Sequence, residues 1–349
     1  MSEIKVNNIQ GLEGTHGPVV SGITTMASSG AMSLPRGDTA YRGGRGRGVF
    51  GGGRLQPTPS AVYTNVIEYV QISTLSDALD FGDLSFDREH VGGSTVASSI
   101  RGIWAGGYGA TGEDHISYVT ISSTGNAFDF GDLTGNTRNF PSHSNNTRGI
   151  FGPCNRQPTG ANSQIQYITI ATTGNAAEFG QLGQPGIEGQ GAAGVGDSTR
   201  AIFCGGYISS PNKDNGMYYV TIATLGNALD FGDIADGAVY AGSASGSGRG
   251  IIAGGRRISA DRVDTIDYIT VQSLGDSIDF GNLTSTRADM RGGASNGTRA
   301  IFAGGVTPSY DDTMDYIEIM TTGNAQDFGN LSVSAKYHAG LSDSHGGIS

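Results

Sequence analysis

One unit of 48 to 52 residues, repeated six times, constrains most strongly what this chain can fold into. Its clearest copy covers residues 299–331 and reads RAIFAGGVTPSYDDTMDYIEIMTTGNAQDFGNL. That copy holds an arginine before a short apolar run, a Gly-Gly pair, a loop, an alternating run around a tyrosine, a Gly-Asn turn and Asp-Phe-Gly. The phenylalanine of the last motif recurs at Phe81, Phe130, Phe179, Phe231, Phe280 and Phe328.

Several features of the unit predict β-strands. The tyrosine runs alternate polar and apolar residues, which is the side-chain period of a strand. A turn of two small residues, Gly-Asn in four copies, then connects each tyrosine run to the phenylalanine run, as in a tight hairpin. A further strand is predicted from the small residues before each arginine, for example at residues 288–298. Because the chain has 59 glycines and no convincing helical stretch, its predicted class is all-β.

The period and the four strands per unit predict a six-bladed β-propeller. The last segment, residues 335–349, aligns with the small-residue run 288–298 of the preceding unit. We therefore expect the C-terminus to supply the inner strand of the first blade and so close the ring, which removes free sheet edges. Residues 39–46 are the alternative source of that strand.

Residues 1–45 differ from the repeats and form a predicted extended N-terminal arm, which is followed by the propeller at residues 46–349. The arm has no aromatic residue before Tyr41 and only scattered apolar ones. Such a segment cannot bury enough apolar surface to fold alone. We expect the arm to become ordered by lying on another chain, and a homo-oligomer formed through the arm is one version of that contact.

Charge and composition argue against several kinds of partner. The net charge of −11 disfavours nucleic acid, because phosphates require a basic surface. The sequence has neither a signal-peptide pattern nor an apolar run of membrane-spanning length, so no membrane insertion is expected. Cys154 and Cys204 occupy different points of two repeats, which favours small buried strand residues over a disulfide, a metal site or redox chemistry.

The motifs that recur in the unit are interpreted as structural. Asp-Phe-Gly occurs in five copies without the other motifs of a kinase, so its phenylalanine is expected to pack between blades. The arginines that open the apolar runs are expected to tie adjacent blades through backbone carbonyls or a carboxylate, and a ring of guanidinium groups that binds an anion is the alternative. They are Arg47, Arg101, Arg148, Arg200, Arg249 and Arg299.

No catalytic residue, metal site or cofactor is predicted. The six histidines lack metal-ligand spacing, although a ring would allow His90, His143 and His338 to meet. Sequence variety is concentrated in the loops between the Gly-Gly and tyrosine strands, where a rigid scaffold usually carries its binding residues. The candidate ligand-binding residues are the loop aromatics Tyr108, Tyr207 and Tyr310, whose rings can stack on sugars.

Two stretches of the chain resemble known families. A Gly-Gly pair after an apolar strand, a tyrosine in the next strand and an aromatic residue in the last resemble the kelch repeat over residues 47–349. The chain departs from that family by carrying phenylalanine where tryptophan is usual, and Pro153-Cys154 in place of one Gly-Gly pair. The segment VSGITTMASSGAMSLPRGDTAYR, residues 20–42, resembles leader segments of tail-fibre and other appendage proteins of tailed bacteriophages, especially cyanophage-like ones.

These resemblances imply a viral structural protein of the phage virion, without enzymatic activity, made in the cytoplasm of an infected bacterial host. The arm is expected to dock onto other virion proteins. The propeller is expected to be displayed for host attachment through a surface glycan or receptor, or to decorate the particle. Two alternatives stand beside this hypothesis: a carbohydrate-active propeller enzyme, and an intracellular kelch-type scaffold for protein interactions.

Overall fold

The computed structural model describes residues 46–56, 62–90, 96–109, 113–156, 160–183, 189–209 and 212–348. In these ranges every helix or strand element is a β-strand, so the all-β prediction is confirmed. None of these residues forms a helix long and apolar enough to cross a membrane. The predicted arm, residues 1–45, lies outside the described residues.

The repeats form separate antiparallel sheets whose strands follow the predicted order: small-residue, arginine, tyrosine and phenylalanine strand. The arginine strands are β1 (Arg47–Gly51), β7 (Arg101–Ala105), β13 (Arg148–Phe151), β19 (Arg200–Cys204), β26 (Arg249–Ala253) and β31 (Arg299–Val306). The tyrosine strands are β4 (Val66–Gln71), β9 (His115–Thr120), β16 (Gln164–Thr169), β22 (Gly216–Thr221), β28 (Val263–Thr270) and β32 (Tyr310–Glu318). The phenylalanine strands are β5 (Leu79–Asp83), β10 (Phe128–Asp132), β17 (Ala177–Gln181), β23 (Leu229–Asp233), β29 (Ile278–Arg287) and β33 (Gln326–Asn330).

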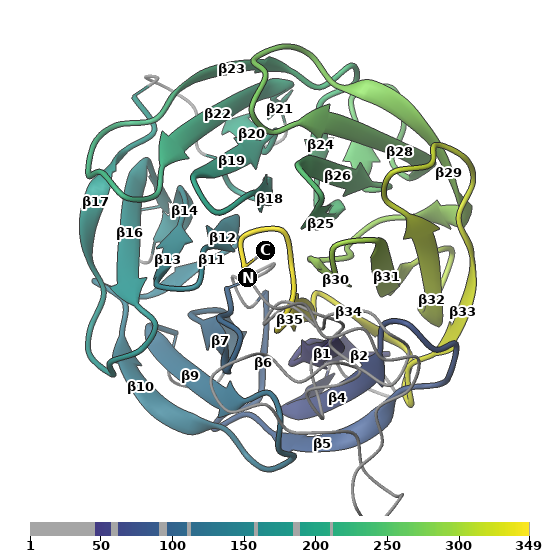
Figure 1. The fold of residues 1–349 in the computed structure, drawn as a ribbon, viewed down its shortest axis with the longest axis horizontal. Helices are drawn as coiled ribbons and strands as arrows, with labels where there is room; N and C mark the ends of the chain where they lie inside the picture. The colour runs from purple at the N-terminus through teal and green to yellow at the C-terminus, as the bar shows by residue number, and fades with distance from the viewer. Residues whose placement is uncertain are drawn as a thin grey trace, which may run out of the picture. The chain divides into compact units, whose positions relative to one another are not determined.

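The small-residue strands are short and lie innermost in the ribbon (Figure 1). They are β12 (Ser142–Ser144), β18 (Ala193–Gly196), β25 (Gly242–Gly246), β30 (Gly293–Ser295) and β35 (Ala339–Ser342). In the second repeat the described residues at this place, 96–100, contain an isolated bridge between Ala97 and Gly102, and the carbonyl of Val96 accepts a hydrogen bond of 3.0 Å from the amide of Ile103. The sheet of that repeat therefore has three strands, in the order β10-β9-β7.

Short strands that the sequence did not predict pair in the connections between these elements. They are β2 (Arg54–Leu55), β3 (Val62–Tyr63), β6 (Arg88–Glu89), β8 (Tyr108–Gly109), β11 (Thr137–Arg138), β14 (Cys154–Arg156), β15 (Gly160–Asn162), β20 (Tyr207–Ser209), β21 (Asn212–Lys213), β24 (Ala238–Val239), β27 (Arg256–Arg257) and β34 (Ala335–Lys336). Four of these short strands, β6, β11, β24 and β34, end directly before a residue with a left-handed backbone.

The C-terminal strand β35 lies beside the first arginine strand. β35 pairs antiparallel with β1 from Gly48↔Ser342 to Gly51↔Ala339, while β4 pairs with the other edge of β1. Both edges of β1 are therefore occupied, and the segment expected from the alignment supplies one of them. Of the alternative source, residues 39–46, all but Gly46 lies outside the described residues.

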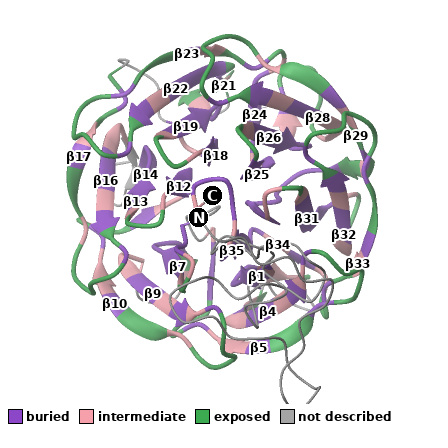
Figure 2. Cartoon of the chain, in the orientation of Figure 1, coloured by how far each residue is buried: buried purple, intermediate pink, exposed green. Residues whose placement is uncertain are grey.

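The sheets are arranged around a common centre (Figure 1). Clusters of apolar side chains connect each sheet to the next. One cluster packs Phe50 and Val70 of the first sheet against Ile301 and Phe328 of the last. Buried residues follow the inner strands, whereas exposed ones follow the phenylalanine strands and their turns (Figure 2). The core therefore lies between the faces of neighbouring sheets, as expected when flat antiparallel sheets bury both faces.

The repeat arginines tie neighbouring sheets, which confirms the structural interpretation of them. Each guanidinium lies 4.3–4.8 Å from the centroid of the tyrosine ring in its own sheet. The Nη1 atom of each also donates a hydrogen bond of 2.7–3.2 Å to a backbone carbonyl of the next repeat. The donor Arg299 reaches the carbonyl of Ile72, so the series returns from the last repeat to the first.

Replacement of Arg148 by lysine should lower the free energy of unfolding by about 1–2 kcal/mol. An ammonium cannot stack flat on Tyr167 while it also donates to the carbonyl of Ile222, as the guanidinium does. Thermal unfolding measured by circular dichroism checks this expectation. Arg262→Lys is the matched control, because the ion pair of that side chain with Asp261 is 3.9 Å long and joins neighbours in the chain. Equal unfolding temperatures for the two variants would contradict the tie.

The Asp-Phe-Gly motif joins the repeats at their outer edge. Phe81 is buried with its ring edge against Tyr69, and the carbonyl of Phe81 accepts a hydrogen bond of 2.7 Å from the amide of Gly125 in the next turn. Gly82 has φ +145°, and a Cβ there would lie 2.5 Å from the backbone of that turn. The motif therefore docks each sheet on the next, in agreement with its structural interpretation.

Candidate functional site

Six equivalent positions, one per repeat, bring polar and aromatic side chains together. Each precedes the small-residue segment of its repeat and has a left-handed backbone with φ between 54° and 81°. The positions are His90, Asn139, Gly191, Tyr240, Asp289 and Tyr337. A left-handed conformation costs a non-glycine residue about 1–2 kcal/mol, and it persists only where the surroundings impose it.

Backbone hydrogen bonds between repeats impose this conformation. The amide of Asn139 donates to the carbonyl of His90 at 3.5 Å, and the amide of Gly191 donates to the carbonyl of Asn139 at 2.7 Å. The amide of Tyr240 in turn donates to the carbonyl of Gly191 at 2.8 Å. The left-handed turn thus belongs to the fold, whereas the side chains it carries are free to differ.

Those side chains meet across the centre of the fold. The rings of His90 and Tyr337 have centroids 3.7 Å apart, and Tyr240 lies 5.6 Å from Tyr337 and 6.1 Å from His90. Arg291 places its guanidinium 4.8 Å from the centroid of Tyr240 and donates to Oδ1 of Asn139 at 2.7 Å. We call the residues His90, Asn139, Tyr240, Asp289, Arg291 and Tyr337 the central cluster.

Three further cations border the central cluster, and we call Arg54, Arg138 and Lys336 the basic rim. Arg54 Nη1 lies 3.8 Å from Oε1 of Glu89, and Lys336 Nζ lies 3.6 Å from Oδ2 of Asp289. The guanidinium of Arg138 lies 4.7 Å from the ring centroid of Tyr108. The rim therefore combines positive charge with aromatic surface.

Asp289 and Glu89 are the carboxylates of this region, and they differ in how well they are paired. The buried Asp289 carboxylate accepts two hydrogen bonds of 2.9 Å from Arg256. Burial raises the pKa of Glu89, although Arg54 and other nearby cations oppose that rise. Oε2 of Glu89 and Nε of Arg291 are buried without hydrogen-bond partners. Unpaired buried polar atoms are costly, so they mark where a ligand would gain most.

The chemistry of the cluster favours binding over proton transfer. Burial, reinforced by Arg291 and Arg138, holds the pKa of His90 well below its usual value, so this ring is neutral near pH 7. Burial also raises the pKa of Tyr337, which keeps its hydroxyl protonated. Neutral rings next to fixed cations can stack on a ligand and hydrogen-bond to it.

The structure places the predicted tyrosines beside this region. Tyr207 packs edge-on against Tyr240 with ring centroids 6.0 Å apart. Tyr310 lies 5.0 Å from Nζ of Lys336, which itself lies over Tyr337. Tyr108 packs against Tyr63 at 5.7 Å and beneath Arg138. The loop tyrosines therefore surround the central cluster, which the sequence did not predict.

Other residues considered from the sequence do not enter this site, with the exception of His90. His143 instead pairs with His345 at 5.5 Å between ring centroids, and His338 packs against Phe50 at 6.0 Å. Cys154 and Cys204 are both buried and not disulfide-bonded, as predicted. Over the described ranges no three His, Cys, Asp or Glu residues are placed to hold a metal ion.

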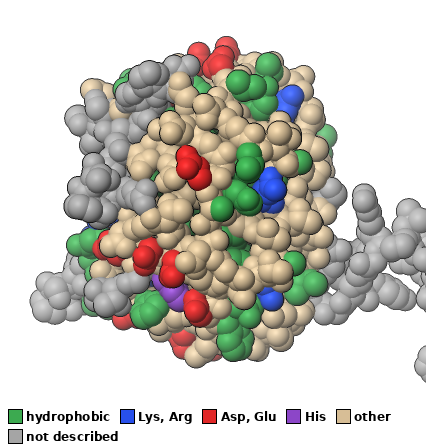
Figure 3. All heavy atoms as spheres, turned by 90° about the vertical axis from the view of Figure 1, so that its left-hand side faces the viewer, with side chains coloured by type: hydrophobic (Ala, Val, Ile, Leu, Met, Phe, Trp, Pro, Cys, Tyr) green, Lys and Arg blue, Asp and Glu red, His purple; other side chains and the backbone are tan. Residues whose placement is uncertain are grey.

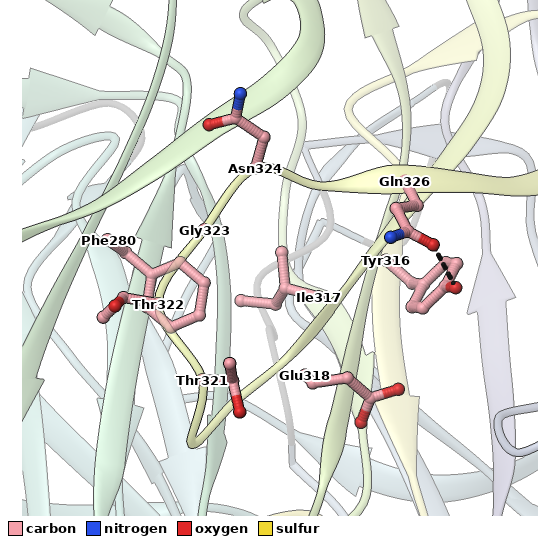
Figure 4. A pocket seen from close by; sticks show the side chains of 9 residues that line it. All are labelled: Phe280, Tyr316, Ile317, Glu318, Thr321, Thr322, Gly323, Asn324 and Gln326. Atoms are coloured by element: carbon pink, nitrogen blue, oxygen red, sulfur yellow. Dashed lines mark hydrogen bonds between the residues drawn. The ribbon is translucent and has the colours of Figure 1, made fainter.

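A pocket at the outer edge is a weaker candidate because it recurs. A hollow of about 300 Å³ lies between the fifth and sixth repeats, beside Phe280, Tyr316 and the Gly323-Asn324 turn (Figure 4). Within it, Tyr316 Oη donates to Oε1 of Gln326 at 2.7 Å. A second hollow of about 170 Å³ lies at the equivalent turn of the fourth repeat. Such hollows arise from the repeated turn itself and do not indicate a specific binding site.

The side of the molecule in Figure 3 shows acidic and hydrophobic side chains interspersed among polar ones. Exposed apolar residues such as Leu79, Phe128 and Leu229 lie on the phenylalanine strands. Scattered apolar residues of this kind are normal on a protein surface and need no partner.

Comparison with known proteins adds no relative. No protein-family model matches the chain, and no curated protein matches it.

Proposed function

We propose that residues 46–349 form a six-bladed kelch-like β-propeller closed by the C-terminal strand. The repeated strand order, the six apolar clusters between neighbouring sheets and the arginine contacts from each repeat to the next support this architecture. The pairing of β1 with β35 supports closure in particular. Each sheet is one blade on this reading, and the central cluster lies at one end of the axis.

The function that fits this geometry best is a non-enzymatic structural component of a phage virion that recognises a glycan on the host surface. The central cluster and its neighbouring tyrosines carry this proposal. Sugar-binding sites combine aromatic faces with a few well-placed polar groups, and this region offers both. The same region takes its side chains from several repeats, as a recognition surface on a rigid scaffold does.

The N-terminal arm has a separate role in this proposal. Residues 1–45 dock the chain onto other virion proteins, which leaves the propeller displayed outward. Support comes from the composition of the arm, which has too few apolar residues to fold alone, and from the resemblance of residues 20–42 to phage appendage leaders.

Deletion of residues 1–45 should remove the protein from virions without unfolding the propeller. Mass spectrometry of purified particles should find the full chain, and should not find the deletion variant when it is expressed during infection. Circular dichroism and a thermal melt of the variant control for folding. Normal incorporation of the deletion variant would overturn the docking role of the arm. Absence of the full chain from purified virions would overturn the virion function itself.

A further inference from the structure

We propose that the central cluster and its basic rim bind a carboxylate-bearing saccharide, an acidic sugar of the hexuronic type. This inference deepens the proposed function and rests on it for the glycan. It goes further by naming the charge of the ligand and the side chains that select it.

The distribution of cations in the chain is the first argument. The chain carries 21 lysines and arginines within a net charge of −11. Six arginines tie the repeats, and three more are buried among polar groups: Arg88, Arg257 and Arg287. Four of the other cations, the three of the basic rim and Arg291, act together on Glu89 and His90. An acidic protein thus places four cations close to one another, around Glu89 and His90.

The carboxylates nearby neutralise only part of this charge, through the contacts of Asp289 with Lys336 at 3.6 Å and of Glu89 with Arg54 at 3.8 Å. Asp289 is already held by two hydrogen bonds from Arg256. Glu89 lies 3.8 Å from Arg54, which is longer than a hydrogen bond, and its Oε2 atom has no partner. An incoming anion would therefore find cations that lack a full partner. A planar carboxylate suits them, because a guanidinium can bind both of its oxygens.

The choice of side chains at the left-handed positions is the second argument. The fold requires a positive φ there, and glycine would meet that requirement without strain. A chain with 59 glycines nevertheless uses one only at Gly191 among the six positions. The other five carry histidine, asparagine, tyrosine, aspartate and tyrosine, all capable of hydrogen bonding or stacking. Side chains kept at such a cost point to a role beyond folding.

Aromatic surface beside the cations is the third argument, and it indicates that the anion belongs to a sugar. Tyr108 stands by Arg138, and Tyr310 stands by Lys336. In each pair the cation lies over the ring, so a pyranose that packs against the uncovered part of the tyrosine has a cation close by for its carboxylate. A small inorganic anion has no apolar face that could stack on these rings.

Titration calorimetry with the full chain tests this site. Hexuronate oligosaccharides should bind at low salt, weaken as salt is added, and be recovered intact, whereas neutral hexose oligomers of the same length should bind at least about tenfold more weakly. The double variant Arg138→Gln, Lys336→Gln should lose at least about tenfold in affinity for the hexuronates. Arg262→Gln removes a cation outside the cluster and should stay within about twofold of the parent. Thermal melts confirm that the variants fold.

Other outcomes would overturn the inference. Equal affinity for neutral and acidic oligomers would show that the charge of the ligand does not contribute to binding. Tighter binding of sulfated oligomers than of hexuronates would show that the site does not select a carboxylate. Unchanged affinity of the double variant for hexuronates would show that the binding site lies elsewhere on the protein. Release of shorter sugars would show that the protein cleaves the oligosaccharides, which would contradict a site that only binds them. Binding of a neutral host glycan alone would refute this inference and leave the proposed function standing. Hexuronate binding by a chain that is absent from virions would refute the proposed virion function and leave this inference standing.

Discussion

Removal of residues 343–349 should lower the midpoint of thermal unfolding by about 10 °C, since it costs about 5 kcal/mol at about 2 °C per kcal/mol for a large domain. The segment lies at the centre of the ribbon and contacts several sheets (Figure 1). Oδ1 of Asp343 accepts hydrogen bonds from the amides of Gly46 and Arg47 at 2.6 and 3.2 Å. The amide of Gly346 donates to the carbonyl of Ser245 at 2.9 Å.

His345 adds contacts to two more repeats. Its Nε2 atom lies 3.2 Å from the carbonyl of Ala97 and 3.3 Å from Oγ of Ser144. Ile348 packs against the apolar cluster between the first and second sheets. Truncation would deprive the amides of Gly46 and Arg47 of their acceptor, Asp343, and would remove the contacts of His345 and Ile348. Each buried group left unsatisfied costs about 1–3 kcal/mol.

Differential scanning calorimetry of the truncated and full chains measures this effect. Ile348→Ala and Ile258→Ala form a matched pair, because the first residue packs in the core cluster and the second is 60% exposed. We expect the first to lower the unfolding temperature and the second to leave it within about 1 °C. A truncated chain that melts with the full chain would show that the inner strands hold together without the C-terminal segment.

The sequence predicted the strands because their determinants are local. Alternation around Tyr316 is the period of a strand, and the small Gly-Asn turn fixes the hairpin that follows. The equal spacing of the phenylalanines required equivalent sheets, and the alignment of residues 335–349 placed the strand that became β35. Because the same pattern recurs in six copies, a strand that is weakly indicated in one copy can be recognised from the equivalent residues of the others.

The central cluster could not be predicted in the same way. Five of its six members, all but Arg291, share a backbone conformation and differ in residue type, so His90, Tyr240 and Tyr337 form no motif in the sequence. Their meeting depends on contacts between repeats that are far apart in the chain. The loop tyrosines were predictable because aromatic residues stand out in variable loops. In the second repeat the predicted inner segment is described from residue 96 onward, where Ala97 forms a bridge to Gly102.

Acid should destabilise the protein through three buried histidines, His143, His338 and His345. All three are at most 2% exposed, and burial lowers their pKa values to about 4, about 4 and about 3. In the unfolded chain the pKa of each is about 6.5. The unfolded state therefore binds more protons below pH 6.5, and stability falls as the pH falls from 6.5 toward 4.

The contacts of His345 show why its protonation is costly. Its Nδ1 atom accepts a hydrogen bond from the amide of Gly347 at 3.1 Å, so a proton on that nitrogen would break the bond. A charge on His345 would also face the neighbouring ring of His143, which lowers the pKa of His345 further. Burial of the raised-pKa carboxyls of Glu68, Asp214 and Asp267 acts in the opposite direction and offsets part of the loss.

Between pH 7.5 and pH 5 each histidine should cost about 2 kcal/mol, or about 6 kcal/mol together before that offset. A loss of this size is comparable to the whole stability of many domains. Urea denaturation at pH 7.5, 6.5, 5.5 and 5 measures it as a falling free energy of unfolding. His143→Gln and His345→Gln should each flatten the slope, even where they lower stability at pH 7.5. A replacement of the half-buried His115 by glutamine, which should change the slope less, is the control. A free energy of unfolding that stays constant from pH 7.5 to pH 5 would contradict neutral burial of these rings.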